Sequence, residues 1–205
     1  KFIYSHGGYA REIQRIVASQ FPNETHIFVD DEPGDLAISY REALERAEVE
    51  TSSFSVAFSE PELRKKKTEQ VLTDGFQLFS VTATTAIVGQ NVIIGDGSMI
   101  SDFSMITADV KIGAGFQCNI YSYVAHDCVV GDFVTLAPRV SINGRVKIGD
   151  GVYIGTGATI LPGVDGKPLA IGSRAVIGAH ALVTRDVPDG VTVIGTPAKP
   201  LTKGF

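Results

Sequence analysis

A six-residue repeat runs through most of the chain and limits the folds that the chain can adopt. From Val88 to Ile160 every sixth residue is aliphatic apart from Cys118, and after one slip the series continues from Ile171 to Val183. A strand has a period of 2 and a helix one of 3.6, so a period of 6 predicts short strands broken by regular corners. Three sides make a coil of about 18 residues, as in a solenoid. The repeat predicts a parallel β-helix of triangular cross-section with its aliphatic anchors inside.

A second position in the repeat is also restricted. The residue four places after each anchor is small or medium-sized throughout, with Phe116 as the one large member. We expect these residues to fit the tight corners of a solenoid that spans residues 82–187. The slip at residues 165–169 predicts a surface loop. The turn-rich segment 193–200 is expected to cap the last coil, because an open solenoid end needs a cover.

The first 80 residues have a different organisation. Short apolar segments alternate with segments of helical period, which predicts a small parallel sheet covered by helices. The expected strands cover residues 2–4, 26–29, 54–58 and 76–79, and the expected helices cover residues 10–20, 40–47 and 62–72. This part holds nine Lys and Arg against 14 Asp and Glu, whereas the remainder holds nine of each and no glutamate. We therefore predict two domains, residues 1–80 and 81–205.

Composition excludes several classes of protein. The chain is 44% hydrophobic and 20% charged, and no apolar run reaches the length of roughly 18 residues that a membrane helix needs. No signal-peptide pattern is visible, so we expect a cytoplasmic protein without a membrane partner. No basic face of the kind that binds nucleic acid is apparent. The basic run 64–67 stands among glutamates and is interpreted as a solvated helix face. Cys118 and Cys128 fall on inward repeat positions, which indicates buried thiols and not a disulfide or metal ligands.

One histidine interrupts the small and apolar pattern of the repeat. His126 lies two positions after an anchor, so we expect it to point outward near a corner, with Asp127 beside it and Asn119 about one side earlier. A neutral histidine near a carboxylate can act as a general base close to neutral pH. A solvated surface histidine is the alternative. His180, among Gly178 and two alanines, favours a structural role, and with two histidines in the repeat we expect no metal site.

A glycine turn follows the first expected strand. In parallel sheets such a turn holds phosphates, because free backbone N–H groups and the helix dipole point at the ligand. The turn is Ser5-His6-Gly7-Gly8, and Asp30-Asp31 follows the second strand, where carboxylates can accept hydrogen bonds from a ribose or a base. Ser5 replaces the first glycine of the usual dinucleotide pattern. The turn therefore predicts either a site for one nucleotide or a purely structural turn, with His6 and His26 incidental.

Three segments together resemble a known family. They are the turn 7–12 with Asp30-Asp31, the stretch 124–132 around His126, and the tail 195–200. The chain is similar to the hexapeptide-repeat acyltransferases, specifically the branch of sialic-acid O-acetyltransferases and bacillosamine-pathway N-acetyltransferases. The resemblance covers nearly the whole chain. It implies a small α/β, Rossmann-like βαβ domain followed by a left-handed parallel β-helix, with the chain assembled as a homotrimer.

The resemblance also implies roles for individual residues. His126 matches the catalytic base and Asp127 its acidic partner, Asn119 matches a polar residue near the acceptor amine, and the Gly144 amide matches a donor to the thioester carbonyl. Acetyl-CoA is expected between neighbouring prisms, and a UDP-linked amino sugar on the N-terminal domain. The residues implied for acetyl-CoA are Gly155, Gly178, Ala179 and Lys199, and those implied for the nucleotide sugar are Gly7, Gly8, Tyr9, Asp30 and Asp31. Tyr9 stands where relatives often have a histidine, and Thr135 stands where one relative has a second active-site histidine.

The residues and the resemblance together predict an enzyme. We expect an acetyl-CoA-dependent N-acetyltransferase that acts on the 4-amino group of a UDP-2-acetamido-4-amino-2,4,6-trideoxyhexose used for surface glycans. One alternative is an O-acetyltransferase of the same fold, which would use the same base on a hydroxyl group. Another is a non-catalytic binding or assembly module, in which His126 would be an ordinary surface residue.

Overall fold

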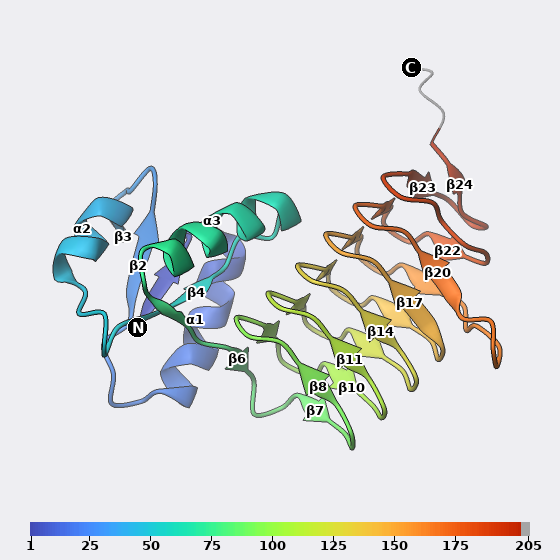
Figure 1. The fold of residues 1–205 in the computed structure, drawn as a ribbon, viewed down its shortest axis with the longest axis horizontal. Helices are drawn as coiled ribbons and strands as arrows, with labels where there is room; N and C mark the ends of the chain where they lie inside the picture. The colour runs from blue at the N-terminus through green and yellow to red at the C-terminus, as the bar shows by residue number, and fades with distance from the viewer. Residues whose placement is uncertain (202–205) are drawn as a thin grey trace.

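The computed structural model describes residues 1–201 and has two parts, a small sheet with helices and a long three-sided prism (Figure 1). The sheet is parallel, with strand order β3-β2-β1-β4-β5. Its elements are β1 (Phe2–Tyr4), α1 (Gly8–Gln20), β2 (Ile27–Asp30), β3 (Ala37–Ser39), α2 (Tyr40–Arg46), β4 (Ser53–Val56), α3 (Pro61–Thr73) and β5 (Gln77–Leu78). The expected alternation of strands and helices is confirmed, and β3 is an additional strand that was not predicted.

Capping residues define where the helices of this part begin. The Ser39 hydroxyl accepts a hydrogen bond from the Glu42 N–H at 3.1 Å and so starts α2. Glu60 caps α3, where its carboxylate accepts from the Glu62 N–H at 3.0 Å, and Pro61 occupies the first turn. These side chains supply the acceptors that the first N–H groups of a helix lack.

The helices cover both faces of the sheet, and one of them also contacts the prism. α1 packs Ile13 and Val17 against Val81 and Met99 of the first coils. α2 and α3 cover the opposite face, where Tyr40 and Val71 pack with the central strands. The sheet is therefore attached to the prism through a shared apolar core and not through a flexible linker.

Three ladders form the faces of the prism. Each is named here by its first strand. The β6 face holds β6 (Val81–Thr82), β9 (Met99–Ile100), β12 (Gln117–Cys118), β15 (Thr135–Leu136), β18 (Tyr153–Ile154), β21 (Val176–Ile177), β23 (Thr192–Ile194) and β24 (Lys199–Pro200). The β7 face holds β7 (Ile87–Val88), β10 (Met105–Ile106), β13 (Tyr123–Val124), β16 (Ser141–Ile142), β19 (Thr159–Ile160) and β22 (Leu182–Val183). The β8 face holds β8 (Ile93–Ile94), β11 (Lys111–Ile112), β14 (Val129–Val130), β17 (Val146–Ile148) and β20 (Leu169–Ile171). The strands of these ladders are parallel except for β24, which is antiparallel to β23. The expected parallel β-helix is confirmed.

The register of the ladders explains the repeat. Cys118 lies opposite Leu136, 18 positions on, and Val124 lies opposite Ile142 in the same way. The anchors are buried from Ile100 onward, whereas Val88 in the first coil is 42% exposed. Both cysteines are free and buried, as predicted.

The corners of the prism use a left-handed backbone conformation. Ten non-glycine residues have φ between 54° and 63°, a region that few residues other than glycine adopt. They are Asn91, Phe103, Asp109, Tyr121, Asp127, Phe133, Arg139, Arg145, Arg174 and His180. Each turns the chain from one face to the next, so the side chains next to it can converge.

The slip in the repeat is a surface loop, as predicted, and it begins earlier than the sequence indicated. It connects β19 to β20, and the Val164 and Lys167 backbones are hydrogen-bonded to each other at 2.9–3.1 Å. The ladder resumes with Val146 opposite Leu169. The insertion leaves the stacking of the coils intact.

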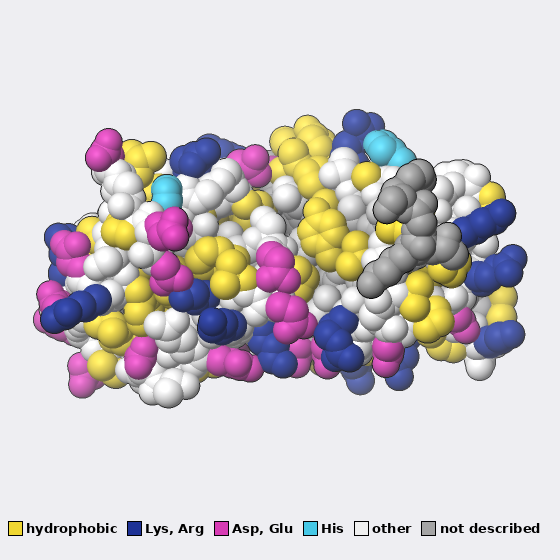
Figure 2. Space-filling view, turned by 90° about the horizontal axis from the view of Figure 1, so that it is seen from above, with side chains coloured by type: hydrophobic (Ala, Val, Ile, Leu, Met, Phe, Trp, Pro, Cys, Tyr) yellow, Lys and Arg dark blue, Asp and Glu magenta, His cyan; other side chains and the backbone are white. Residues whose placement is uncertain are grey.

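The prediction of a solvated basic face at residues 64–67 is wrong for two of its four residues. Arg64 is 0% exposed and Lys67 is 9% exposed, whereas Lys65 and Lys66 are exposed. Residues three apart share one side of a helix, so Arg64 and Lys67 face the body of the molecule together. On the face shown in Figure 2, Lys and Arg lie among Asp and Glu over much of the surface.

Candidate active site

His126 lies at the corner where the β7 face meets the β8 face. β13 precedes this corner and β14 follows it. Adjacent side chains of an extended strand point to opposite sides, but Asp127 has φ of 59°, which turns its carboxylate towards the histidine ring. His126 Nδ1 is 2.7 Å from Asp127 Oδ2. The predicted contact between the two residues is therefore present.

This contact determines which imidazole nitrogen of His126 can accept a proton. Nδ1–H donates to the Asp127 carboxylate, so the neutral ring carries its lone pair on Nε2. The His126 side chain is 49% exposed, so Nε2 can be reached from outside. A ring held in this tautomer can accept a proton from a bound amine or hydroxyl group.

Gly144 lies against the histidine ring, one coil further along the prism. A Cβ atom added at Gly144 would lie 2.7 Å from both Cε1 and Nε2 of His126, closer than real Cβ atoms approach. Any side chain here would displace the ring, so glycine at this position lets the ring lie against the backbone. Within residues 1–201 the Gly144 N–H donates to no other group, and it remains available to a ligand beside the ring.

Arg145 is a further charged residue at this corner, and sequence reasoning missed it. Its Nε lies 4.0 Å from Asp127 Oδ2 and 2.7 Å from Asp165 Oδ1 of the surface loop. The register of 18 residues places Arg145 above Asp127, and this spacing could have revealed it. The slip in the six-residue repeat did not indicate that the loop would bring the Asp165 carboxylate to the corner that holds His126.

Asn119 occupies a different corner from His126. It follows β12, where the β6 face meets the β7 face, and its Oδ1 accepts from the Ile120 N–H at 2.8 Å. The strand β13 separates the two residues, and no hydrogen bond joins them among the described residues. A role for Asn119 near an acceptor amine stays a prediction.

The four residues expected to contact acetyl-CoA form one column on the corner between the β6 and β7 faces. A Cβ at Gly155 would lie 2.6 Å from the Ala179 nitrogen, and one at Gly178 would lie 2.7 Å from Ile194 Cγ2. Ile194 in turn pairs with Lys199. Close stacking of the coils accounts for both glycines without a ligand, so their contact with acetyl-CoA also stays a prediction.

His180 and Thr135 have structural surroundings. The His180 ring lies over Gly157, where an added Cβ would approach it to 2.6 Å. Thr135 is 3% exposed on the β6 face, beneath α3, and its hydroxyl bonds the Ser59 carbonyl at 2.9 Å. Thr135 is thus outside the corner that holds His126.

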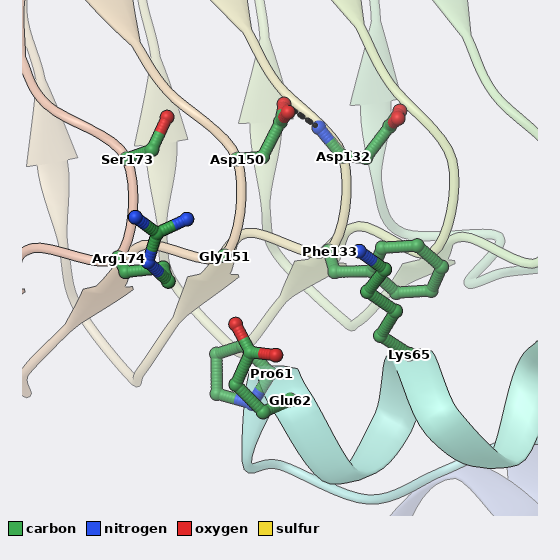
Figure 3. A pocket seen from close by; sticks show the side chains of 9 residues that line it. All are labelled: Pro61, Glu62, Lys65, Asp132, Phe133, Asp150, Gly151, Ser173 and Arg174. Atoms are coloured by element: carbon green, nitrogen blue, oxygen red, sulfur yellow. Dashed lines mark hydrogen bonds between the residues drawn. The ribbon is translucent and has the colours of Figure 1, made fainter.

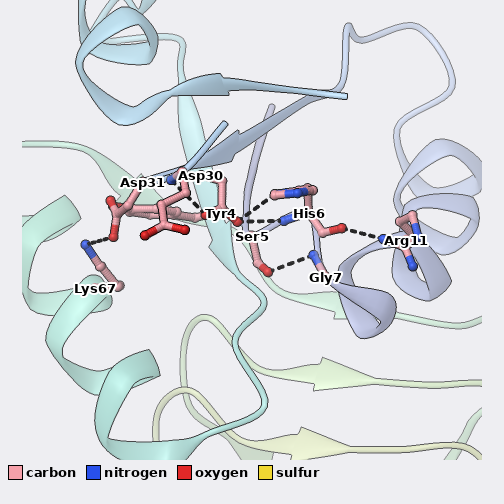
Figure 4. Close-up of polar contacts among 9 residues, drawn as sticks. Tyr4, Ser5, His6, Gly7, Arg11, Asp30, Asp31 and Lys67 are labelled. Carbon is pink, nitrogen blue, oxygen red and sulfur yellow. Dashed lines mark hydrogen bonds and ion pairs between the residues drawn. The ribbon is translucent and has the colours of Figure 1, made fainter. Parts of the chain in front are cut away.

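The predicted nucleotide turn lies at the carboxyl end of β1, beside the end of β2 (Figure 4). Gly7 caps α1, and its N–H donates to the Ser5 hydroxyl at 3.1 Å. Asp30 Oδ2 accepts from the His6 N–H at 3.1 Å and lies 2.8 Å from His6 Nδ1. His6 is therefore not incidental, because it ties the turn to Asp30. The short distance between the two strand ends carried no sequence signature.

Asp31 and Tyr9 have partners within the protein. Asp31 accepts from the Tyr4 hydroxyl at 2.6 Å and forms an ion pair with Lys67. Burial alone would raise the pKa of Asp31, but the hydrogen bonds from Lys67 and Tyr4 outweigh it and hold that pKa below its usual value. The Tyr9 side chain is 8% exposed and its hydroxyl lies 3.4 Å from Ser101 Oγ. Only the backbone of Tyr9 remains for the nucleotide contact that was predicted.

The cavity of about 130 Å³ in Figure 3 lies elsewhere, between the start of α3 and the corner where the β8 and β6 faces meet. Lys65, Arg174 and two aspartates line it, and His126 does not. Residues 1–201 hold no cluster of three His, Cys, Asp or Glu that could bind a metal. Nor do they include a helix with the length and apolarity required to cross a membrane.

Comparisons with known proteins agree with this architecture. Residues 127–162 match the family described as bacterial transferase hexapeptide (six repeats). The GDP-perosamine N-acetyltransferase of Escherichia coli O157:H7 is 38% identical over 211 residues, which cover 98% of this chain and 96% of that protein. WeeI from Acinetobacter baumannii AYE has a TM-score of 0.93 at 38% identity, with 98% of each chain covered.

A third relative carries ligands. PerB from Caulobacter crescentus, solved in complex with CoA and GDP-perosamine, has a TM-score of 0.87 at 30% identity and covers 98% of this chain and 96% of its own. Each relative matches both the N-terminal sheet and the prism, because the alignments span nearly all of both chains. This protein is therefore an enzyme and belongs to the hexapeptide-repeat, left-handed β-helix sugar acetyltransferases.

Proposed function

We propose that the enzyme transfers the acetyl group of acetyl-CoA to the amino group of a nucleotide-linked amino sugar. The observation that carries this proposal is the corner at which His126, held by Asp127 at 2.7 Å, lies against Gly144. A base and a backbone N–H then stand side by side, which is the arrangement that acyl transfer to an amine requires.

The reaction follows from this geometry. The amine attacks the thioester carbonyl and passes a proton to His126 Nε2, while the Asp127 carboxylate stabilises the imidazolium that forms. The carbonyl oxygen takes up negative charge and accepts a hydrogen bond from the Gly144 N–H. Collapse breaks the C–S bond, and the CoA thiolate takes a proton from His126. General-base help contributes roughly 10²–10⁴ in rate, and an oxyanion donor roughly 10²–10³.

We assign the acetyl donor to the column of Gly155, Gly178, Ala179 and Lys199. This column flanks the β7 face on the side opposite His126, so the acetyl group would reach the His126 of a neighbouring prism. Small residues let an extended ligand approach the backbone closely. PerB, which covers 98% of this chain, binds CoA, and this supports the assignment of the same donor. Acetyl-CoA supplies the activated acetyl group, and the protein residues bind it and move the protons.

We assign the nucleotide to residues 1–80. Among the described residues the Gly8 N–H has no acceptor, and it lies at the start of α1, which suits a diphosphate. Asp30 and Asp31 stand at the end of β2, beside the turn. Because Asp30 already accepts two bonds from His6, it shapes the turn as well as offering oxygens to a ligand.

The identity of the base is a separate question. The sequence led us to expect UDP, whereas the names of the E. coli and C. crescentus relatives carry GDP-perosamine. We infer that a GDP-linked amino sugar is the first acceptor to test and a UDP-linked 4-amino sugar the second. Such a product would serve as a precursor of surface glycans.

We further propose a homotrimer with the active site between neighbouring prisms. Phe103 and Tyr121 stack on each other at 5.1 Å on one corner and are 56% and 58% exposed. Exposed apolar residues of this size suit a surface covered by another subunit. A site shared between subunits would make activity depend on assembly.

The decisive experiment measures thiol release from acetyl-CoA with a panel of GDP-, UDP- and dTDP-linked 4-amino sugars. Each amino sugar is paired with the matching sugar that has a hydroxyl group at the reacting carbon. We expect release with at least one amino sugar and none with its hydroxyl counterpart. Release with the hydroxyl sugars alone would establish O-acetylation, and no release with any member of the panel would contradict the proposal.

A further inference from the structure

Helix α3 carries a fully buried cation that no carboxylate neutralises. Arg64 is 0% exposed and forms no ion pair within residues 1–201. Burial lowers the pKa of its guanidinium to about 10, so the group remains charged at neutral pH. Burying a charge among neutral groups is costly unless its hydrogen bonds are satisfied. An apolar side chain would leave the buried carbonyl groups around it without donors, so the guanidinium serves hydrogen bonding and not packing alone.

The hydrogen bonds of Arg64 join the two parts of the molecule. Carbonyls of the prism accept from the guanidinium group. The Gly115 carbonyl accepts from Arg64 Nε at 2.8 Å, and the Phe133 carbonyl accepts from one terminal nitrogen at 2.9 Å. From its own part, the Phe58 carbonyl accepts from the other terminal nitrogen at 2.7 Å. The Thr135 hydroxyl accepts from Arg64 at 2.9 Å and donates to the Ser59 carbonyl at 2.9 Å. The terminal nitrogens of Arg64 also donate to the Ser59 and Val134 carbonyls, each at 3.3 Å. A planar guanidinium can bind several acceptors in both parts at once, because its N–H donors have fixed directions.

The prism carbonyls that accept from Arg64 lie at the two ends of the coil that carries His126. Gly115 comes just before β12, and Phe133 lies at the next β8–β6 corner, just before β15. His126 lies between them in the chain, seven residues before Phe133. Arg64 therefore holds α3 against the two ends of the segment that positions His126 and Asp127.

The same helix reaches the predicted nucleotide site one turn later. Lys67 forms an ion pair with Asp31 and lies over the Tyr4 ring, 5.2 Å from its centroid. Arg64 and Lys67 lie three residues apart on one side of α3. A single helix thus contacts the acidic end of β2 through Lys67 and the catalytic coil through Arg64.

We propose that Arg64 is a positioning residue that fixes the distance between the nucleotide-binding turn and the catalytic coil, so that a bound nucleotide sugar presents its amine at the right place. This inference rests on the proposed function. A reacting group held in place gains a large effective concentration, and a displacement of about 1 Å can cost on the order of 100-fold in rate. A looser α3 would leave both ligands bound but would misplace the amine.

The test uses the full-length enzyme and the sugar nucleotide that the wild type accepts in the panel. In Arg64→Lys a single ammonium group replaces the fork and cannot reach all of these acceptors. In Thr135→Val one acceptor of Arg64 is removed. Lys66→Met on the exposed side of α3 is the matched control. For each variant we would measure the Kd of the nucleoside diphosphate, the Kd of CoA, and the single-turnover rate of acetyl transfer.

We expect Arg64→Lys to keep both Kd values within about twofold while the single-turnover rate falls roughly 10- to 100-fold. Thr135→Val should show the same pattern with a smaller loss, and Lys66→Met should match the wild type. The two substitutions should be less than additive in the double variant, because they act on one hydrogen-bond network.

Two results would overturn the inference. One is an unchanged single-turnover rate in a folded Arg64→Lys or Thr135→Val enzyme. The other is a loss of nucleotide affinity in proportion to the loss of rate, since Arg64 would then merely keep the N-terminal part folded. If Arg64→Lys does not fold, Thr135→Val decides alone by the same criteria. Failure of the proposed function would look different, because the wild type itself would then bind no nucleoside diphosphate or transfer no acetyl group.

Discussion

At the scale of single residues, the left-handed turn at Asp127 determines the chemistry of the site. It brings a carboxylate to Nδ1 of the preceding histidine and leaves Nε2 to the substrate. Adjacent residues in an ordinary strand could not make this pair. The dyad therefore depends on the corner that carries it as much as on the two side chains.

His126→Ala tests this site directly. We expect kcat to fall by roughly 10²–10⁴, with the Tm nearly unchanged because the side chain is half exposed. The residual rate should rise with pH as free amine replaces ammonium. Steady-state kinetics from pH 6 to 9 and a thermal melt are the measurements. Wild-type kcat with an unaltered pH profile would show that the proton leaves by another route.

Gly144→Ala probes the surface beneath the ring. The new Cβ would lie 2.7 Å from His126 Nε2, so the ring must move, and we expect kcat to fall at least tenfold, as for other small misplacements of reacting groups. Gly34→Ala is the control, because a Cβ there meets nothing within 4 Å. Equal activities of the two variants would contradict the placement of the ring over Gly144.

Asp31 links stability to pH. Its pKa is lower in the folded protein than its ordinary value of 3.8, because the hydrogen bonds from Lys67 and Tyr4 outweigh burial. The ionised form therefore stabilises the fold above the unfolded-state pKa, and this contribution is lost as pH falls through the folded-state pKa. We expect Tm to decline between about pH 5 and 2, and less steeply in Asp31→Asn. Parallel Tm curves for the two proteins would refute this expectation.

At the scale of elements, each coil depends on the side chains that fill it. Phe116 is 0% exposed and is the largest member of its series, so Phe116→Ala leaves a cavity. We expect a loss of about 3–5 kcal/mol in the free energy of unfolding. Leu36→Ala, at a position 63% exposed in the N-terminal part, should cost far less. Denaturant unfolding of both variants would compare them, and similar losses would argue against the interior position of Phe116.

The coils were predictable because hydrophobic periodicity reports burial directly. Anchors such as Val124 and Ile142 repeat with the register of the ladders. Arg64 was not predictable in this way, since its partners are mostly backbone carbonyls, which every residue possesses. His6 and Asp30 meet across two strand ends, and local sequence cannot show that distance. His126 and Asp127 were found because they are adjacent, whereas Arg145 needed the register first.

At the scale of the whole molecule, assembly is the remaining test. We expect sedimentation at working concentration to give the mass of three chains, about three times 21.8 kDa. Tyr121→Glu should weaken assembly and lower activity together, because the site is proposed to lie between subunits and Tyr121 is 58% exposed. A fully active monomer would contradict both the trimer and the shared site.

The two ends of the prism differ in whether their strand edges are open, and this affects how molecules can associate end to end. At the first coil, β7 and β8 are paired on one side only among the described residues, so their outer edges are open. At the last coil the tail covers all three faces. β24 pairs with β23 on the β6 face, Leu182 of β22 exchanges backbone hydrogen bonds with Gly195 and Ala198, and Val187 bridges Ile171 of β20. A fibre of stacked prisms would need an open edge at both ends of every molecule. Because residues 187–200 cover one end, contact between open edges stops at a pair of molecules, and the fold itself prevents polymerisation.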